Sequence, residues 1–359
     1  MQRLKPYFFA EVSAHIESLR AAGRDVIRLD IGAPDMPPAP DIVAALVSAA
    51  GRADTHGYQP YKGTPELRAA WAHWYQREFA VQIDPETQIM PLLGSKEGIF
   101  HLTQALVNDG DVVLAPDPGY PTYRRAADFA GAEIFLLPLR TANAFLPDLD
   151  AIPAEVAQRA KLMWLNYPNN PTGAVASHEF LEHAVAFSKE HDVLLVHDAP
   201  YSHVVYDGYT SPSILQVAGA TDVAVELCSL SKSHNMAGLR VGAAVGNEAA
   251  VHALYVLKTN IDTGHYLPVM EAATQALTGD QSWIADRNAV YRARRDLLVE
   301  TLNTCGFSPN IPRASLYIWA GLPDGNESAL FTRSLLDETG VSLAPGTAFG
   351  KNGEGFVRV

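Results

Sequence analysis

The chain has 359 residues, of which 48% are hydrophobic, and its 40 acidic and 27 basic residues give a formal net charge of -13. This length exceeds what one hydrophobic core usually serves, so we expect two domains. The negative charge would repel phosphate backbones and anionic membrane surfaces, which argues against a nucleic acid or a membrane as partner.

Cysteine usage and hydropathy predict a soluble, cytoplasmic protein. The two cysteines, Cys228 and Cys305, support neither a disulfide framework nor a zinc knuckle, and a reducing compartment suits them best. Residues 1–10 are interrupted by charges and a proline and show no export signal. No run of about 18 apolar residues lacks charge, so we expect no membrane-spanning helix.

In chain order, the first clearly predicted element is a helix from Pro65 to about Phe79, with Thr64 as its cap and Pro65 in its first turn. Next, short β-rich runs alternate with helical stretches up to residue 246, which predicts the α/β class: a mostly parallel sheet with helices on both faces. Ligands of such sheets gather at the carboxyl ends of the strands. The predicted strands span residues 112–115, 134–139, 162–166, 193–197, 223–229 and 241–245, and the intervening helices residues 97–107, 120–130 and 177–191.

A smaller α+β domain is predicted from the N-terminal segment and the residues after about 275. Its elements are a charged helix over residues 286–302 and a strand over residues 316–319. The expected division is an N-terminal segment of the small domain (1–40), a large domain (41–275) and the rest of the small domain (276–359). The chain stops directly after a strand-like run at residues 355–359, so we expect a shortened form without a last helix.

The most informative segment spans residues 229–240 and reads SLSKSHNMAGLR at the end of a predicted strand. The amine of Lys232 can bond to a cofactor aldehyde. Ser229, Ser231 and Arg240 can hold a phosphate, and the guanidinium can do so bidentately. Taken alone, the segment fits an ordinary solvated turn equally well.

A carboxylate and a phenol follow the predicted strand 193–197. Asp198, if buried, could keep a pyridine nitrogen protonated, the charge that lets such a ring act as an electron sink. Tyr201 could donate to a phenolic oxygen of the cofactor. The plainer alternatives are an aspartate that caps a turn and a tyrosine that packs in the core.

Three further segments end predicted strands or begin helices. Residues 166–173, NYPNNPTG, form a rigid turn. Ser95 and Lys96 follow a glycine at a helix start, where backbone amides favour a phosphate. Tyr120 follows a Pro-Gly pair and could stack on a flat heterocycle. Each of these is a weak signal alone, because loops, helix starts and core aromatics all give such patterns.

Together these segments resemble the class I/II aminotransferases of PLP fold type I, the aspartate aminotransferase superfamily, from about Ile31 to Arg358. The resemblance implies a pyridoxal 5′-phosphate (PLP) cofactor on a large domain with a mostly parallel seven-stranded sheet sandwiched by helices, plus a smaller α+β domain. It implies that Lys232 bonds the cofactor and that Asp198 contacts the ring nitrogen. The phosphate ligands that it implies are Ser229, Ser231 and Arg240.

The resemblance also implies the remaining contacts. Tyr201 and Asn170 would meet the cofactor's phenolic oxygen, with Asn170 also near the substrate, and Tyr120 would stack on the ring. Gly32 and Arg358 match groups that hold a substrate α-carboxylate. Tyr58, within HGYQPYKG, matches a tyrosine lent to the neighbouring subunit's phosphate, which predicts a homodimer with shared active sites.

The reaction implied is ping-pong transfer of an amino group between an L-amino acid and a 2-oxo acid, with Lys232 as the general base and acid. GSKEG at residues 94–98, His234-Asn235-Met236 and KTNIDTG at residues 258–264 resemble the LL-diaminopimelate aminotransferase branch. That branch implies LL-diaminopimelate or another dicarboxylic amino acid, with 2-oxoglutarate or glutamate. Aspartate, alanine and N-succinyl-diaminopimelate stay open as substrates.

Two residues are predicted to recognise the far end of the substrate. Glu97 could accept from the distal ammonium of diaminopimelate, and Asn260 could contribute from the partner subunit. The alternative for Glu97 is a first-turn residue that only complements its helix dipole.

Rival classes can be weighed as well. HEFLEH at residues 178–183 nearly matches a zinc-protease motif, but histidines five residues apart lie about 140° apart around a helix, so we predict no metal. A PLP-dependent β-lyase or a PLP-binding regulatory protein remains open, because cofactor motifs report binding more directly than reaction type.

Overall fold

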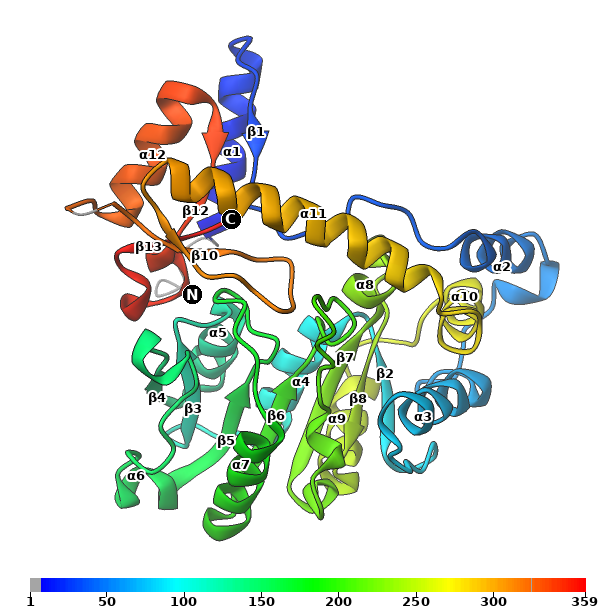
Figure 1. Cartoon of the computed structure of the whole chain (residues 1–359). Coiled ribbons are helices and arrows are strands. Elements are labelled where there is room, and N and C mark those ends of the chain that lie inside the picture. The colour runs from blue at the N-terminus through cyan, green and yellow to red at the C-terminus, as the bar shows by residue number, and fades with distance from the viewer. Residues whose placement is uncertain (1–7, 324) are drawn as a thin grey trace.

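The computed structural model of the chain describes residues 8–323 and 325–359. Residues 1–7, which include most of the stretch predicted to lack an export signal, lie outside the described residues. A seven-stranded sheet with helices on both faces forms the larger part, and the long helix α11 (Trp283–Thr304) runs above it from α10 toward α1 and α12 (Figure 1). In the described part of the chain, none of the helices has the length and apolar character that crossing a membrane requires.

The strands of the large sheet lie in the order β2-β8-β7-β6-β5-β3-β4. All neighbours pair in parallel except β8, which is antiparallel to both β2 and β7. The first residues of β8 therefore lie at the same edge as the carboxyl ends of the other strands. The strands are β2 (Ile89–Leu92), β3 (Val112–Asp117), β4 (Glu133–Pro138), β5 (Ala160–Leu165), β6 (Leu194–Asp198), β7 (Ala224–Ser229) and β8 (Gly242–Gly246).

The sheet confirms the predicted fold class. Its inner strands are buried along their length, as sheets covered on both faces require, which explains their nearly continuous apolar runs. Strand β2 was not predicted as a separate run, because its four residues, IMPL, show no periodicity and contain a proline.

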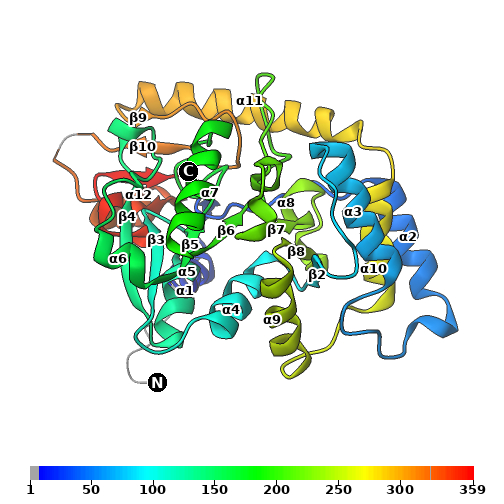
Figure 2. The same ribbon diagram turned by 90° about the horizontal axis from the view of Figure 1, so that it is seen from below.

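Two layers of helices cover the sheet (Figure 2). One face packs against α4 (Ser95–Leu106), α5 (Pro121–Ala130) and α9 (Glu248–Thr259). The other packs against α3 (Pro65–Phe79), α7 (His178–His191) and α10 (Leu267–Thr278), and α2 (Pro40–Ala50) lies on α10. Two short helices, α6 (Ala154–Arg159) and α8 (Leu230–Ser233), complete this part.

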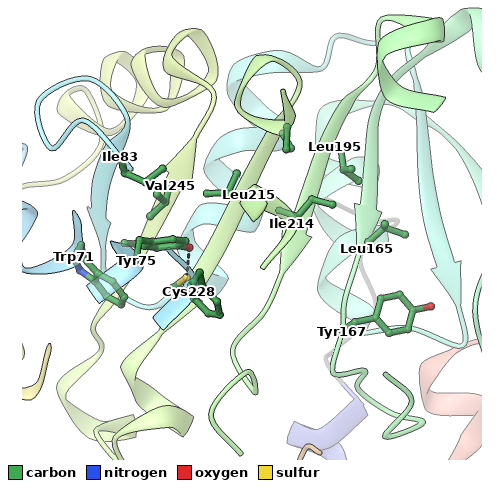
Figure 3. Close-up of a cluster of buried hydrophobic side chains, with 14 of the residues drawn as sticks. Trp71, Tyr75, Ile83, Leu165, Tyr167, Leu195, Ile214, Leu215, Cys228 and Val245 are labelled. Atoms are coloured by element: carbon green, nitrogen blue, oxygen red, sulfur yellow. Dashed lines mark hydrogen bonds between the residues drawn. The ribbon is translucent and has the colours of Figure 1, made fainter. Parts of the chain in front are cut away.

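Helix α3 begins as predicted and delivers aromatic side chains to the core. The Thr64 side chain accepts from the Leu67 amide at 3.3 Å, and Pro65 occupies the first turn. Trp71 and Tyr75 then lie in the cluster that covers β8 and β5 (Figure 3). The Tyr75 hydroxyl lies 2.8 Å from Cys228 Sγ and donates to Glu226 Oε1 at 2.8 Å, so its polar end is satisfied within the core.

The smaller region contains two sheets. Strands β12 (Ala344–Pro345), β13 (Phe356–Arg358), β10 (Trp319–Gly321) and β9 (Ser308–Pro309) form an antiparallel sheet, and β1 (Ile27–Arg28) pairs in parallel with β11 (Val341–Ser342). Helices α1 (Phe8–Ala21), α11 and α12 (Ser328–Thr339) accompany them. These sheets draw on the two predicted parts of the chain, while the boundaries at residues 40 and 275 stay a prediction.

One predicted strand is displaced. The run 316–319 was expected as a strand, but β10 begins only at Trp319. The physical reason is the backbone before it: Ser315 has a φ of +79°, and Tyr317 directs its hydroxyl to that of Tyr201, 2.7 Å away. Strand β13 was expected over residues 355–359, and the structure assigns Phe356–Arg358.

Candidate active site

A cavity of about 370 Å³ opens where the carboxyl edge of the large sheet meets the smaller region. Residues from both parts line it, so the site depends on the packing of one against the other. The predicted residues among its lining are Gly32, Ser95, Lys96, Tyr120, Asn170, Asp198, Tyr201, Ser229, Ser231, Lys232, Arg240 and Arg358.

Lys232 lies in α8, directly after β7, and its Nζ donates to the carbonyl oxygen of Gly32 at 2.7 Å. Burial and the positive charges of Arg240 and Arg358 lower the pKa of Lys232 to about 8. A larger share of the amine is therefore unprotonated near neutral pH, the form that attacks carbonyl carbon and accepts protons. Only glycine fits at position 32, because a β-carbon there would lie 2.1 Å from the Tyr317 ring.

Asp198 ends β6 with its carboxylate buried in the cavity wall. The Tyr123 hydroxyl donates to Oδ2 at 2.7 Å, whereas Oδ1 has no hydrogen-bond partner among the described residues. Burial raises the pKa of Asp198 to about 6, against the opposing effects of Tyr123 and His197. A buried carboxylate oxygen without a donor matches the protonated nitrogen of a pyridine ring, so this atom fits the implied cofactor.

Polar groups form a second cluster, the cradle, which we define as residues 94–96 together with Ser229, Ser231 and Arg240. Ser95 opens α4, so its amide points from a helix N-terminus, a favourable place for an anion. The Arg240 guanidinium donates to Ser231 Oγ at 3.3 Å. Gly94 has a φ of +86°, and a β-carbon on it would lie 2.3 Å from Arg240 Nη2. The hydroxyls, amides and guanidinium suit a phosphate.

Arg358 reaches the cavity from β13. Its guanidinium donates to Asn170 Oδ1 at 2.9 Å and to the Asp30 carbonyl oxygen at 2.6 Å, and it stacks 4.3 Å from the Tyr317 ring centre. Its Nε has no hydrogen-bond partner within the described chain. A buried guanidinium with an unused donor can bind a carboxylate.

Two aromatic residues flank the cavity. Tyr201 is buried, and its hydroxyl lies 2.7 Å from that of Tyr317. Burial raises the pKa of Tyr201 well above its usual value, which keeps the phenol protonated and able to donate. Tyr120 precedes α5 and packs edge-on against Tyr123, with 5.8 Å between ring centres.

Three predicted residues do not line the cavity. Tyr58 is 93% exposed. Asn260, after α9, donates to the Val256 carbonyl oxygen at 2.8 Å. Glu97 binds Lys258 Nζ at 2.5 Å, so its carboxylate is engaged within its own chain.

The near-match to a zinc motif does not form a shared site. His178 lies 3.5 Å from Glu182, and His183 lies 3.0 Å from Asp150, each as a separate exposed pair. The two histidines thus have different partners, as their spacing on α7 predicts.

Tyr123, Asn166 and Tyr317 are among the cavity residues that sequence reasoning missed. Tyr123 follows Tyr120 by one helical turn, a spacing that could have indicated a shared face. Asn166 begins the NYPNNPTG turn, where its Oδ1 accepts from the Asn170 amide at 2.8 Å and its Nδ2 donates to the Asp198 carbonyl oxygen at 2.7 Å. Tyr317 had no signal, because only the fold brings it to Tyr201.

Comparisons with known proteins agree with this geometry. The family model "Aminotransferase class I and II" matches residues 24–359. An LL-diaminopimelate aminotransferase of Dehalococcoides mccartyi is 46% identical, over 100% of this chain and 92% of that protein.

Two solved structures are also similar. Substrate-bound BacF from Bacillus subtilis has a TM-score of 0.96 and 37% identity, over 99% of this chain and 91% of that one. A probable N-succinyldiaminopimelate aminotransferase from Thermus thermophilus has a TM-score of 0.93 and 39% identity, over 98% and 94%. The chain therefore belongs to the class I and II aminotransferases, PLP-dependent enzymes that transfer an amino group between an amino acid and a 2-oxo acid.

Proposed function

We propose that this aminotransferase uses LL-diaminopimelate as its amino donor or product, with 2-oxoglutarate and glutamate as the other pair. The Dehalococcoides relative, 46% identical over the whole chain, carries that name, and this similarity supports the choice of substrate most directly. The Thermus structure keeps N-succinyl-diaminopimelate as the second candidate, since that protein's name states it.

We propose that the cavity residues share the work as follows. The cradle would hold the cofactor phosphate, and Asp198 Oδ1 would accept a hydrogen bond from the ring nitrogen. When bound, PLP acts as an electron sink that stabilises negative charge at the substrate Cα. The atom that carries this assignment is Asp198 Oδ1, a buried oxygen that lacks a donor.

Substrate handling falls to three other groups. Arg358, supported by Asn170, binds the α-carboxylate and orients the Cα–H bond toward Lys232. Lys232 Nζ then takes the Cα proton, which its lowered pKa favours at neutral pH. Tyr201, whose phenol is protonated, would donate to the phenolic oxygen of the cofactor. A Lys232→Ala variant is therefore expected to fold but to lose turnover.

The substrate can be identified from the visible absorption of the PLP-loaded protein. LL-diaminopimelate, N-succinyl-LL-diaminopimelate, aspartate, alanine and glutamate would be added separately. We expect LL-diaminopimelate and glutamate to bleach the band of the bound cofactor, and 2-oxoglutarate to restore it. Bleaching by N-succinyl-LL-diaminopimelate, with no response to LL-diaminopimelate, would favour the second candidate. Release of ammonia and pyruvate in place of amino transfer would instead indicate elimination.

We also propose a homodimer with shared active sites. Large apolar or aromatic side chains, Val47, Tyr58, Tyr61 and Ile261, are more than 40% exposed. They belong to α2, to the segment before α3 and to the loop after α9. That loop and that segment are in contact, since Tyr266 Oη lies 3.1 Å from His56 Nδ1. A second copy would cover this surface, which would bring Tyr58 and Asn260 to the partner's site. A cytoplasmic location likewise stays a prediction.

A further inference from the structure

A buried lysine links the helix that follows the cradle turn to a loop. Lys258, near the end of α9, is 1% exposed, and its Nζ lies 2.5 Å from both Glu97 Oε1 and Asp262 Oδ1. Glu97 is in the first turn of α4, and its other carboxylate oxygen accepts from the Leu93 amide at 2.5 Å. One ammonium thus ties the start of α4 to the loop between α9 and α10.

Lys258 provides the positive charge in the cluster that it forms with Glu97, His101 and Asp262. Glu97, His101 and Asp262 offer ligand atoms within 4.8 Å of one another, a spacing that a metal ion could also use. Burial lowers the pKa of His101, so that ring is neutral at neutral pH. Burial and the nearby Asp262 raise the pKa of Glu97 to about 7, and the Lys258 ammonium opposes this rise. The ammonium therefore neutralises carboxylates that would otherwise repel each other.

The Glu97 contact closes the turn that carries Ser95. Besides the Leu93 amide bound by its side chain, the Glu97 amide donates to the Gly94 carbonyl oxygen at 3.2 Å. The Leu93 carbonyl oxygen also lies 3.5 Å from Arg240 Nη2. Glu97 thus stabilises this turn through both its side chain and its backbone amide. The direction in which the Ser95 amide points depends on the turn.

The loop between α9 and α10 also contacts Arg240, the residue that contributes the guanidinium of the cradle. His265 is buried, and its Nε2 lies 2.9 Å from the Arg240 carbonyl oxygen. Because a carbonyl only accepts, Nε2 must carry the proton and donate it. Residues 258–265 therefore contact both the turn of Ser95, through Glu97, and the backbone of Arg240.

We propose that Lys258 is a positioning residue for the cofactor phosphate, acting through Glu97 on the cradle. The inference rests on the proposed function of the cradle. Backbone amides can bind an anion tightly only when the turn that presents them is already fixed. Lys232 and Asp198, which are proposed to meet other parts of the cofactor, form no hydrogen bond or ion pair with Lys258 in the described part of the chain. The geometry thus gives Glu97 a structural partner, while its contact with the substrate ammonium stays a prediction.

The test compares two ligands of the apoprotein, PLP and pyridoxal, which lacks the phosphate. In Lys258→Met we expect the Kd for PLP to rise about tenfold, the scale of one charge-assisted hydrogen bond, and the Kd for pyridoxal to stay unchanged. Lys189→Met is the matched control, because Lys189 is an exposed lysine that pairs with Asp222 at 3.9 Å. It should change neither Kd.

A second variant guards against misfolding of the first. Glu97→Gln keeps the size of the side chain at the start of α4 but removes the negative charge that pairs with Lys258, and a selective loss of PLP affinity is again expected. Equal weakening of both ligands, or no change for PLP, would overturn the positioning role. A wild-type protein that binds PLP no more tightly than pyridoxal would instead remove the proposed function of the cradle, so the two failures are distinguishable.

Discussion

At the residue scale, the site contains groups that lower the stability of the folded protein when no ligand is bound. The Asp198 carboxylate is buried with one oxygen unpartnered among the described residues, and the partly buried Lys232 lies near two arginines. Such groups oppose folding in the absence of a ligand and are satisfied when the ligand arrives. Their properties can therefore be measured on the apoprotein.

Asp198→Asn is expected to stabilise the apoprotein at neutral pH. The folded pKa, about 6, lies above the ordinary value of 3.8. The stability that this group confers is therefore fully present below pH 4 and is lost as the pH rises to 6. The variant should gain on the order of 2–3 kcal/mol at pH 7 and little near pH 4. Urea unfolding at both pH values measures this, and a gain that does not depend on pH would contradict the burial argument. PLP affinity should fall in the same variant.

The reactivity of Lys232 should follow its lowered pKa. We expect the rate at which the apoprotein takes up PLP to increase with pH through about 8, because only the unprotonated amine bonds to the aldehyde. Arg358→Leu removes one of the charges that lower this pKa, so its profile should shift to higher pH. Stopped-flow absorbance measures the rate, and identical profiles for both proteins would count against the electrostatic cause.

At the scale of elements, short turns decide where the polar groups point. Gly94 combines a φ of +86° with a close approach to Arg240, so Gly94→Ala should lower PLP affinity and cost about 1 kcal/mol of stability. Gly110→Ala is a matched control, because Gly110 has a φ of +81° with nothing within 4 Å of its β-carbon position. It should lose similar stability but keep its PLP affinity. Equal PLP affinities in the two variants would show that Gly94 matters only through its backbone strain and not through its close approach to Arg240.

Elements with buried, continuous apolar runs were predictable from the sequence, and so were the polar residues that end them. Lys232, Asp198 and Asn170 come at or after the ends of such strands. Their places in the cavity could be predicted from one rule, that ligands of such sheets gather at the carboxyl ends of the strands. Tyr317 could not be predicted, since its partner Tyr201 is distant in sequence. The burial of Lys258 and its bond to Glu97 could not be predicted either, because Glu97 is distant in sequence and the nearby Asp262 does not mark the lysine as buried. For Glu97 the opposite holds, because the sequence indicated its place at a helix start but not its partner Lys258.

At the scale of the whole molecule, shared active sites can be tested with hybrid dimers. A Tyr58→Ala chain and a Lys232→Ala chain, tagged differently, would be co-expressed and purified as a pair. If Tyr58 serves the partner's site, one of the two sites is intact, and the hybrid should reach about half of wild-type activity. Both parent homodimers should be far weaker. A hybrid no more active than the Tyr58→Ala parent would place Tyr58 outside the partner's site.

The reversed direction of β8 has a consequence for how the cofactor is retained. Because β7 and β8 are antiparallel neighbours, the single connection between them carries both Lys232 and Arg240. The proposed covalent attachment at Lys232 and the proposed ionic contact of Arg240 with the phosphate thus belong to one segment of the chain. Hydrogen exchange should show the amides of this connection and of both strands gaining protection together when PLP binds. Retention of the cofactor would then depend on the local stability of one strand pair, β7 and β8.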